Sequence, residues 1–261
     1  MKRQDLINKL EKLSPTKYAA SWDNVGLLVG TEEGEVKKVV LALDVTNEVI
    51  EEAIKRKADF IIAHHPIIFS SMKTVNNKTI LGRKLLTLIE HQIACYAMHT
   101  NFDTMGGMAQ LAEQMLALTN TIPLEVVAEE EGQLEGIGRV GMLPSSMTLL
   151  ECANMVKETF QITQVAIVGE ANKTIQRVAI CPGSGKGMIE EAIQKGADVL
   201  ITGDIGHHDA IDALEAGLCM IDAGHYGLEH IFTAFMEQFL KEQCPELIVE
   251  QVDSKCPFWI V

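Results

Sequence analysis

The chain has 261 residues, of which 47% are hydrophobic, and it carries a formal net charge of −14. This length allows one large or two modest domains with a sizeable core, and the hydrophobic fraction excludes a disordered chain. The acidic balance argues against nucleic acid as a partner. No apolar run approaches the roughly 20 residues that a membrane-spanning helix needs.

The first residues, MKRQDLINKLEKLSP, have the pattern of a charged amphipathic helix and lack the apolar core of a signal peptide. Six cysteines are scattered at positions 95, 152, 181, 219, 244 and 256, with no Cys-x-x-Cys pair. This usage is typical of a reducing cytosol and argues against a zinc site made of thiolates. We therefore expect a cytoplasmic protein that has no contact with a membrane.

An internal repeat is the strongest indication of the fold. Residues 38–65, KVVLALDVTNEVIEEAIKRKADFIIAHH, resemble residues 177–204, RVAICPGSGKGMIEEAIQKGADVLITGD. Ile50 and Ile189 stand 139 residues apart, and six further identities recur at the same offset. Each copy reads as strand, turn, amphipathic helix and second strand, which predicts a βαβ unit with parallel strands. We expect an α/β fold of two related lobes, residues 1–125 and 126–261.

Two glycine-rich stretches have a structural interpretation. The stretch EEEGQLEGIG at 129–138 is charged, which predicts a loop or a junction between the lobes. The stretch GSGKG at 183–187 lacks the first glycine and the final Ser or Thr of a phosphate-binding loop. It is a turn that opens a helix, and both an anion site and simple turn geometry stay open for it.

Two adjacent histidines, His64 and His65, interrupt the apolar run ADFIIAHHPIIF. Pro66 removes a backbone donor and ends the strand, so both rings are expected at the carboxyl end of a parallel strand, where α/β proteins bind ligands. Two adjacent imidazoles there can serve two metal ions roughly 3.5–4 Å apart in a hydrolytic centre. A lone histidine on an apolar strand usually has only a structural role. Here seven of the eight histidines fall in four short segments: 64–65, 99, 207–208 and 225/230.

The next predicted strand of each lobe ends in a histidine that is followed four residues later by a carboxylate. The pairs are His99 with Asp103 and His225 with Glu229. Within a helical turn, spacing of i and i+4 brings two side chains to one side. Apolar residues at helical spacing from 228 to 239 place Glu229 in the first turn of a helix. At the repeat offset His64 and His65 correspond to Gly203 and Asp204, so a metal site would not be duplicated symmetrically.

Five segments carry a resemblance to a known family: SWDNVGLLVG at 21–30, HHPIIF at 64–69, HTNFD at 99–103, TGDIGHHDA at 202–210 and GHYGLEH at 224–230. Together they resemble the dinuclear metal-centre family related to the yeast NGG-interacting factor, often labelled GTP cyclohydrolase 1 type 2 homologues. The resemblance covers nearly the whole chain in order. Some relatives carry an extra domain between the lobes, and the short 125–145 region leaves no room for it. We therefore expect a single compact unit without that domain.

The resemblance implies two divalent metal ions in the cleft between the lobes. It implies five metal ligands, with Glu229 able to bridge the ions: His64, His65, Asp103, His225 and Glu229. Three further residues are expected as outer partners of the ligands: His99, Asp204 and His208. Without a thiolate, zinc, iron, manganese, cobalt and nickel all stay open.

The remaining polar residues near these segments have structural alternatives. Asp44, which ends the LALD strand, either orients a ligand or caps the following helix, for which Asn47 is another candidate cap. In the first signature segment, Trp22 is interpreted as a packing anchor. Asp23 and Asn24 are the candidates for polar contact.

The resemblance implies a metal-dependent hydrolase, similar to a GTP cyclohydrolase, in which two metals activate a water that attacks a small molecule, possibly a nucleotide. A phosphoesterase and a non-catalytic metal-binding assembly or regulatory protein stay open as alternatives. The sequence has no motif that selects guanine. The resemblance also implies a ring-shaped homohexamer.

Overall fold

The computed structural model describes residues 1–252 and 255–258, which form two compact units. The first unit combines residues 1–106 with the chain from Phe232 on, and the second unit runs continuously from Gly107 to Ile231. This division differs from the predicted boundary between residues 125 and 126. The reason is that the chain returns, after the second unit, to complete the sheet of the first.

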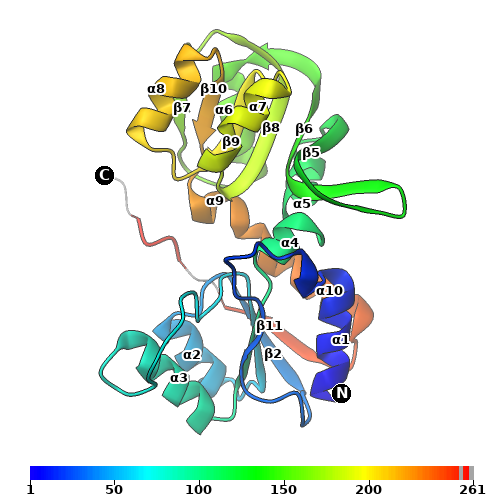
Figure 1. The fold of residues 1–261 in the computed structure, drawn as a ribbon, viewed down its shortest axis with the longest axis vertical. Coiled ribbons are helices and arrows are strands. Elements are labelled where there is room, and N and C mark those ends of the chain that lie inside the picture. Colours follow the sequence, from blue (N-terminus) through cyan, green and yellow to red (C-terminus); the bar gives the residue numbers. More distant parts are fainter. Residues whose placement is uncertain (253–254, 259–261) are drawn as a thin grey trace. The chain divides into compact units, whose positions relative to one another are not determined.

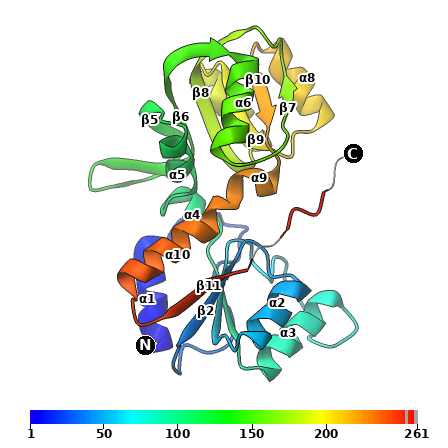
Figure 2. The same cartoon turned by 180° about the vertical axis from the view of Figure 1, so that it is seen from behind.

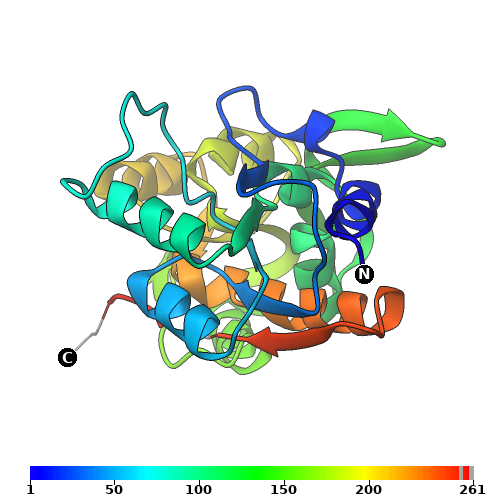
Figure 3. The same cartoon turned by 90° about the horizontal axis from the view of Figure 1, so that it is seen from below.

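The first unit is built on one five-stranded sheet between helices. Its elements are α1 (Arg3–Leu13), η1 (Thr16–Tyr18), β1 (Gly26–Val29), β2 (Lys38–Ala42), α2 (Asn47–Lys55), β3 (Phe60–Ala63), α3 (Ile80–Glu90), β4 (Ala94–Ala97), α4 (Thr100–Thr104), α10 (Ile231–Gln243) and β11 (Ile248–Gln251). The strand order is β1-β4-β3-β2-β11, and every neighbouring pair is parallel except β1 with β4. Helices α2 and α3 lie on one face of the sheet, and α1 and α10 lie on the other (Figure 1, Figure 2). Figure 3 shows the red strand β11 beside the blue strand β2.

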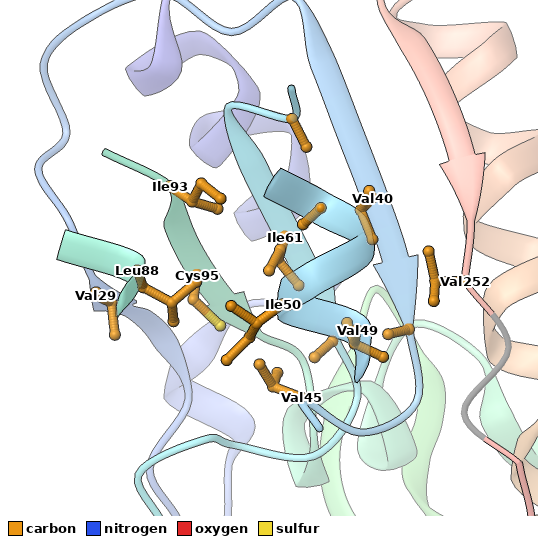
Figure 4. Close-up of a cluster of buried hydrophobic side chains, with 14 of the residues drawn as sticks. Val29, Val40, Val45, Val49, Ile50, Ile61, Leu88, Ile93, Cys95 and Val252 are labelled. Carbon is orange, nitrogen blue, oxygen red and sulfur yellow. The ribbon is translucent and has the colours of Figure 1, made fainter. Parts of the chain in front are cut away.

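Alternating side chains of the parallel strands and the apolar stripes of two helices make the core of this unit. Ile61 of β3 and Cys95 of β4 lie with Ile50 of α2 and Leu88 of α3 in one buried cluster (Figure 4). Complete burial of an aliphatic side chain of this size contributes roughly 1.5–3 kcal/mol. Burial also raises the pKa of the Cys95 thiol to about 12, because the thiolate would have to form in apolar surroundings.

The second unit is built on a six-stranded mixed sheet. Its elements are α5 (Met108–Met115), β5 (Thr119–Glu130), β6 (Gln133–Thr148), α6 (Leu149–Thr159), β7 (Ala166–Val168), β8 (Thr174–Ser184), η2 (Lys186–Met188), α7 (Ile189–Gln194), β9 (Val199–Gly203), α8 (His207–Glu215), β10 (Cys219–Asp222) and α9 (His225–Glu229). The strand order is β5-β6-β8-β9-β10-β7, with β8, β9 and β10 parallel. Helices α7 and α8 cover one face of the parallel strands and α6 covers the other (Figure 1, Figure 2). The α/β fold class predicted from the sequence is confirmed.

The charged stretch at 129–138 is a β-hairpin and not the predicted loop or lobe junction. Strands β5 and β6 pair in antiparallel fashion up to Glu130 and Gln133, so only two residues make the turn. Glu131 and Gly132 both have positive φ, 52° and 82°, as a type I′ turn requires. Glu131 and Gly132 alone make the turn, so the other charged residues and glycines of this stretch can belong to the paired strands.

The predicted repeat is visible in the local structure of the two units. Strands β2 and β3 are joined through α2, as β8 and β9 are joined through η2 and α7, and both strand pairs are parallel. Asp59 Oδ2 accepts hydrogen bonds from the backbone N–H groups of residues 37 and 38, at 2.8 and 2.9 Å. Asp198, 139 residues later, accepts the same two bonds from residues 176 and 177, at 2.8 and 2.7 Å. The recurring aspartate therefore closes the start of the βαβ unit in both copies.

The longest helix of the described residues, α10, has 13 residues. Within the part of the chain that the structure describes, no helix has the length and apolar character to cross a bilayer.

Candidate metal centre

Three histidines gather at one edge of the sheet of the first unit. His64 and His65 directly follow β3, and His99 follows β4, the neighbouring parallel strand. One ring nitrogen from each lies within 4.8 Å of the others, and the ring centroids are 5.0–5.6 Å apart. The prediction that the rings stand at the carboxyl ends of parallel strands is confirmed. This cluster of three imidazoles can hold a metal ion.

Each of the adjacent histidines has its Nδ1 atom occupied by a fixed acceptor. Nδ1 of the fully buried His64 lies 2.7 Å from the carbonyl oxygen of Met98. Nδ1 of His65 lies 2.7 Å from Oδ1 of Asp44. Because a carbonyl or carboxylate oxygen only accepts, Nδ1 carries the proton and donates, which leaves Nε2 as the nitrogen with the lone pair. Such a partner at the far nitrogen orients a metal-binding imidazole and raises its basicity.

His99 is held in the same way, by Asp23. Both carboxylate oxygens of Asp23 lie 2.9 Å from His99 Nδ1, and Oδ2 also accepts from the backbone N–H and the hydroxyl of Thr100, at 3.0 and 2.5 Å. Burial alone would raise the pKa of Asp23, but the hydrogen bonds from His99 and Thr100 outweigh it and lower that pKa to about 2. The Asp23 side chain is therefore a fixed anion at Nδ1 of His99.

Asp103 lies in the short helix α4, beside the histidines. Its Oδ1 is 3.7 Å from Nε2 of His64, so imidazole and carboxylate donors meet at this edge. The backbone N–H of Asp103 donates to the carbonyl of His99 at 3.0 Å, which closes the first turn of α4. The first unit thus brings together three of the five predicted ligands, together with His99.

The second unit has a smaller histidine–carboxylate cluster around α9. His225 Nδ1 lies 2.8 Å from Oδ2 of Asp204, and His225 Nε2 lies 2.9 Å from Oε2 of the buried Glu229. A Cβ on Gly183 would collide with Glu229 Oε1, and a Cβ on Gly203 would lie 2.5 Å from the backbone nitrogen of His225. The counterpart of His64 is therefore a glycine because the backbone of α9 occupies that space. Asp204, the counterpart of His65, orients His225.

The two histidine–carboxylate pairs differ by one residue in their position relative to the start of the helix that follows each strand. Helices α4 and α9 both have five residues, and their N-caps are His99 and Gly224. His225 is thus the first residue of its helix, whereas His99 precedes its helix. The pattern of a histidine and a carboxylate four residues later conceals this difference.

Several other interpretations are settled by the contacts. Asp44 binds His65, while Thr46 caps α2 by accepting from the N–H of Val49 at 3.2 Å, so neither Asp44 nor Asn47 is the cap. His208 is exposed at the start of α8, where its ring contacts the ring of His207. The structure does not bring His208 against His225 or Glu229, within the residues it describes. The carbonyl of Met98 was not among the predicted partners, because a backbone acceptor leaves no mark in the sequence.

The glycine-rich turn at 183–187 has packing reasons for its glycines. Gly183 has φ of 75° and lies against Glu229, and the N–H of Gly185 donates to the Thr202 hydroxyl at 2.8 Å. The helix that follows, α7, has only six residues. These contacts favour the turn-geometry interpretation over the anion site.

The interpretation of Trp22 as a packing anchor is wrong. Its side chain is 61% exposed, and its ring contacts Phe69, which is itself 55% exposed. Asp23, the next residue, is the one that turns inward, since its carboxylate holds His99 and Thr100. Asn24 donates its amide to the carbonyl of Ile68 at 2.6 Å. The polar contacts predicted for Asp23 and Asn24 are confirmed.

The fold and these clusters define an α/β protein of two related units with histidine-rich sites that can hold metal. The model of the family described as Duf34/NIF3 (NGG1p interacting factor 3) matches residues 1–257, so the chain belongs to this family. The resemblance predicted from the sequence is confirmed.

Known relatives and solved structures agree with this assignment. The chain is 36% identical over 262 residues to a "GTP cyclohydrolase 1 type 2 homolog" from Clostridium perfringens, with 99% of both chains covered. A Bacillus cereus protein related to NIF3 is similar in structure, with a TM-score of 0.92, 25% identity and coverage of 100% of this chain and 99% of that one. Reduced HcgD from Methanocaldococcus jannaschii is similar with a TM-score of 0.83, 29% identity and coverage of 96% and 97%.

The donor set fits a divalent transition metal. Imidazole nitrogen and carboxylate oxygen suit zinc, iron, manganese, cobalt and nickel, and no cysteine lies among these donors. The stronger argument is orientation, because all three histidines of the cluster in the first unit have Nδ1 held by an acceptor. Imidazoles that bind metal through Nε2 have this second interaction almost without exception.

Proposed function

We propose that the protein is a metal-dependent hydrolase whose centre holds two divalent ions. The proposed ligands come from both units: His64, His65, Asp103, His225 and Glu229. The observation that carries the proposal is the orientation of the histidine rings, which lie in one cluster within 4.8 Å and each have Nδ1 held by an acceptor. The family resemblance supports this set of five ligands.

Paired ions, when bound, supply Lewis-acid chemistry: they polarise a substrate oxygen and make a water more acidic. The residues of this chain contribute orientation and charge. Asp44 and Asp23 hold the imidazoles of His65 and His99 in the tautomer that presents Nε2. The buried carboxylate of Glu229 supplies a negative charge that a cation at this site compensates.

The name of the relatives, GTP cyclohydrolase 1 type 2 homolog, supports a nucleotide such as GTP as the first substrate to test. A phosphoesterase uses the same arrangement of residues, because paired ions stabilise both the attacking and the leaving oxygen of a phosphoryl group. The two activities differ in the bond that they break. A phosphoesterase cleaves a phosphate ester, whereas a cyclohydrolase opens a ring of the base.

The first experiment measures bound metal. Elemental analysis of protein purified without chelators should find more than one transition-metal ion per chain. His65→Ala and His225→Ala, one from each unit, should each reduce the metal content, whereas His91→Ala, at an exposed histidine after α3, should not. Fewer than one ion in the wild-type protein, with no uptake on reconstitution, would end the proposal of a metal centre.

The second experiment measures turnover. Metal-loaded protein is offered GTP, other nucleotides and simple phosphoesters, beside Glu229→Ala and the control Glu242→Ala, an exposed glutamate of α10. We expect turnover that Glu229→Ala abolishes and Glu242→Ala retains. Bound metal with no turnover on any substrate would instead support the non-catalytic assembly or regulatory protein. The hexameric ring and the cytoplasmic location stay predictions, and light scattering that finds a monomer would refute the ring.

A further inference from the structure

An exposed pair of aromatic rings stands beside the histidine cluster of the first unit. The side chains of Trp22 and Phe69 are 61% and 55% exposed, and their ring centroids are 5.8 Å apart. Both rings make T-shaped contacts with the His99 ring, with centroid distances of 6.0 Å for Trp22 and 6.5 Å for Phe69. Single exposed apolar residues are ordinary, but two large rings in contact beside a polar cluster mark a binding surface.

The backbone that carries the two rings is held in place. Asn24 donates its side-chain amide to the carbonyl of Ile68 at 2.6 Å, which ties the loop of Trp22 to the segment of Phe69. The N–H of Asp23 donates to the carbonyl of Ala20 at 2.9 Å, and the Asp23 carboxylate is bonded to His99. These hydrogen bonds therefore hold the backbone that carries the two rings in place beside the histidines.

The exposure of Phe69 does not result from a lack of apolar surroundings. Its neighbours Ile67 and Ile68 pack against the buried cluster of the first unit, so this segment already has side chains directed inward. Trp22 precedes a residue whose carboxylate is fully buried. In both segments the polar or aliphatic neighbour turns in and the aromatic ring stays in solvent, at a cost in apolar exposure that a ligand would offset.

We propose that Trp22 and Phe69 form a stacking platform for the planar heteroaromatic group of the substrate. The inference rests on the proposed function, since it assigns a substrate class to the same site. The Trp22 side chain retains most of its aromatic surface in solvent, and stacking of a base on an aromatic ring is tolerant of the identity of the base. A nucleobase on the platform would lie next to His99 and thus beside the proposed metal centre.

Calorimetry on the metal-loaded full chain tests the platform with two probes, guanosine 5′-monophosphate and ribose 5-phosphate, which lacks the base. We expect Trp22→Ala to weaken the binding of the nucleotide roughly 5- to 150-fold, the effect of losing one stacked base. Phe69→Ala should weaken it as well, and Trp22→Phe should restore most of the affinity. The affinity for ribose 5-phosphate should be the same in all of these variants.

Ile89→Ala is the matched control, because Ile89 is a large apolar residue of α3 that is 57% exposed. Its nucleotide affinity should equal that of the wild type. The proposal is overturned by equal nucleotide binding in Trp22→Ala and wild type, or by wild-type protein that binds the nucleotide no tighter than ribose 5-phosphate. It is also overturned if Trp22→Ala changes only the subunit number in light scattering, since the rings would then serve self-association.

Metal content separates a failure of the platform from a failure of the proposed function. Neither aromatic residue is a proposed ligand, so elemental analysis should find the same metal in every variant. If the protein binds metal and turns over substrate but Trp22→Ala has the nucleotide affinity of the wild type, only the platform is wrong. If the wild-type protein takes up no metal, the hydrolase proposal fails whatever the stacking result.

Discussion

Replacement of Asp23 should have a large effect on the stability of the first unit. Its buried side chain accepts hydrogen bonds from His99 and from both the N–H and the hydroxyl of Thr100. Replacement by Asn keeps one oxygen but removes the charge and one acceptor. We therefore expect Asp23→Asn to destabilise this unit and to release the His99 ring.

The pKa of Asp23 sets the size of this effect. A pKa lowered from 3.8 to about 2 corresponds to roughly 2 kcal/mol of stability at neutral pH, since a change of one in the pKa is worth about 1.4 kcal/mol. Because the folded-state pKa lies below the unfolded one, this contribution is complete well above pH 3.8 and is lost as the pH falls toward 2. The difference between wild type and Asp23→Asn should therefore be at least about 2 kcal/mol at pH 7 and about half as large at pH 3.

Urea unfolding of chelator-treated protein measures this difference, with the fluorescence of Trp22 as reporter in a Trp259→Phe background. Trp22 adjoins Asp23, so the signal follows the unit that the substitution affects. The exposed Asp212→Asn in α8 serves as control and should change the stability by less than about 0.5 kcal/mol. A difference for Asp23→Asn as small as this control, or one that does not shrink on acidification, would refute the reasoning.

Three further predictions concern the repeat, the thiols and the glycine beside the second cluster. Asp59→Ala and Asp198→Ala should each lower the free energy of unfolding by roughly 2–4 kcal/mol, because one carboxylate oxygen accepts both N–H groups. The Asn variants should lose about half of that, since Asn retains a carbonyl. Hydrogen exchange should increase only in the unit that carries the substitution. A thiol reagent at pH 8 should label the native protein rapidly at Cys256 alone, and labelling should be absent in Cys256→Ser, because all other cysteines are buried. Gly183→Ala should displace Glu229 and lower the metal content while circular dichroism stays unchanged, and a normal metal content would contradict the packing described.

The repeat and the strand ends could be predicted because they are local. The periodicity of the apolar residues, the glycine turns and Pro66 can each be recognised within a short stretch of sequence. The structure places β3 and β9 at residues 60–63 and 199–203, which agrees with the offset of 139. The histidines were found for the same reason, since each follows an apolar run. Asp44 could be considered as an orienting group because it follows β2, which neighbours β3, the strand before His65.

The misses all depend on contacts between distant parts of the chain. The return of the chain to the first unit rests on β11 pairing with β2, and Lys38 and Glu250, which form an ion pair at 2.8 Å, are 212 residues apart. Hydropathy predicts that Trp22 is buried, and only the position of its neighbour Asp23 against His99 explains why the ring remains outside. The hairpin turn at Glu131 was missed because its charges were interpreted as a loop.

The late pairing of β11 with β2 has a consequence for synthesis on the ribosome. Residues 107–231 contain every strand of their own sheet, so this unit can fold as soon as it has left the exit tunnel. The first unit emerges earlier yet lacks α10 and the edge strand until residues 232–251 have been made. We expect the order of folding to reverse the order of translation, so that the half of the protein that carries three histidines of the cluster matures last.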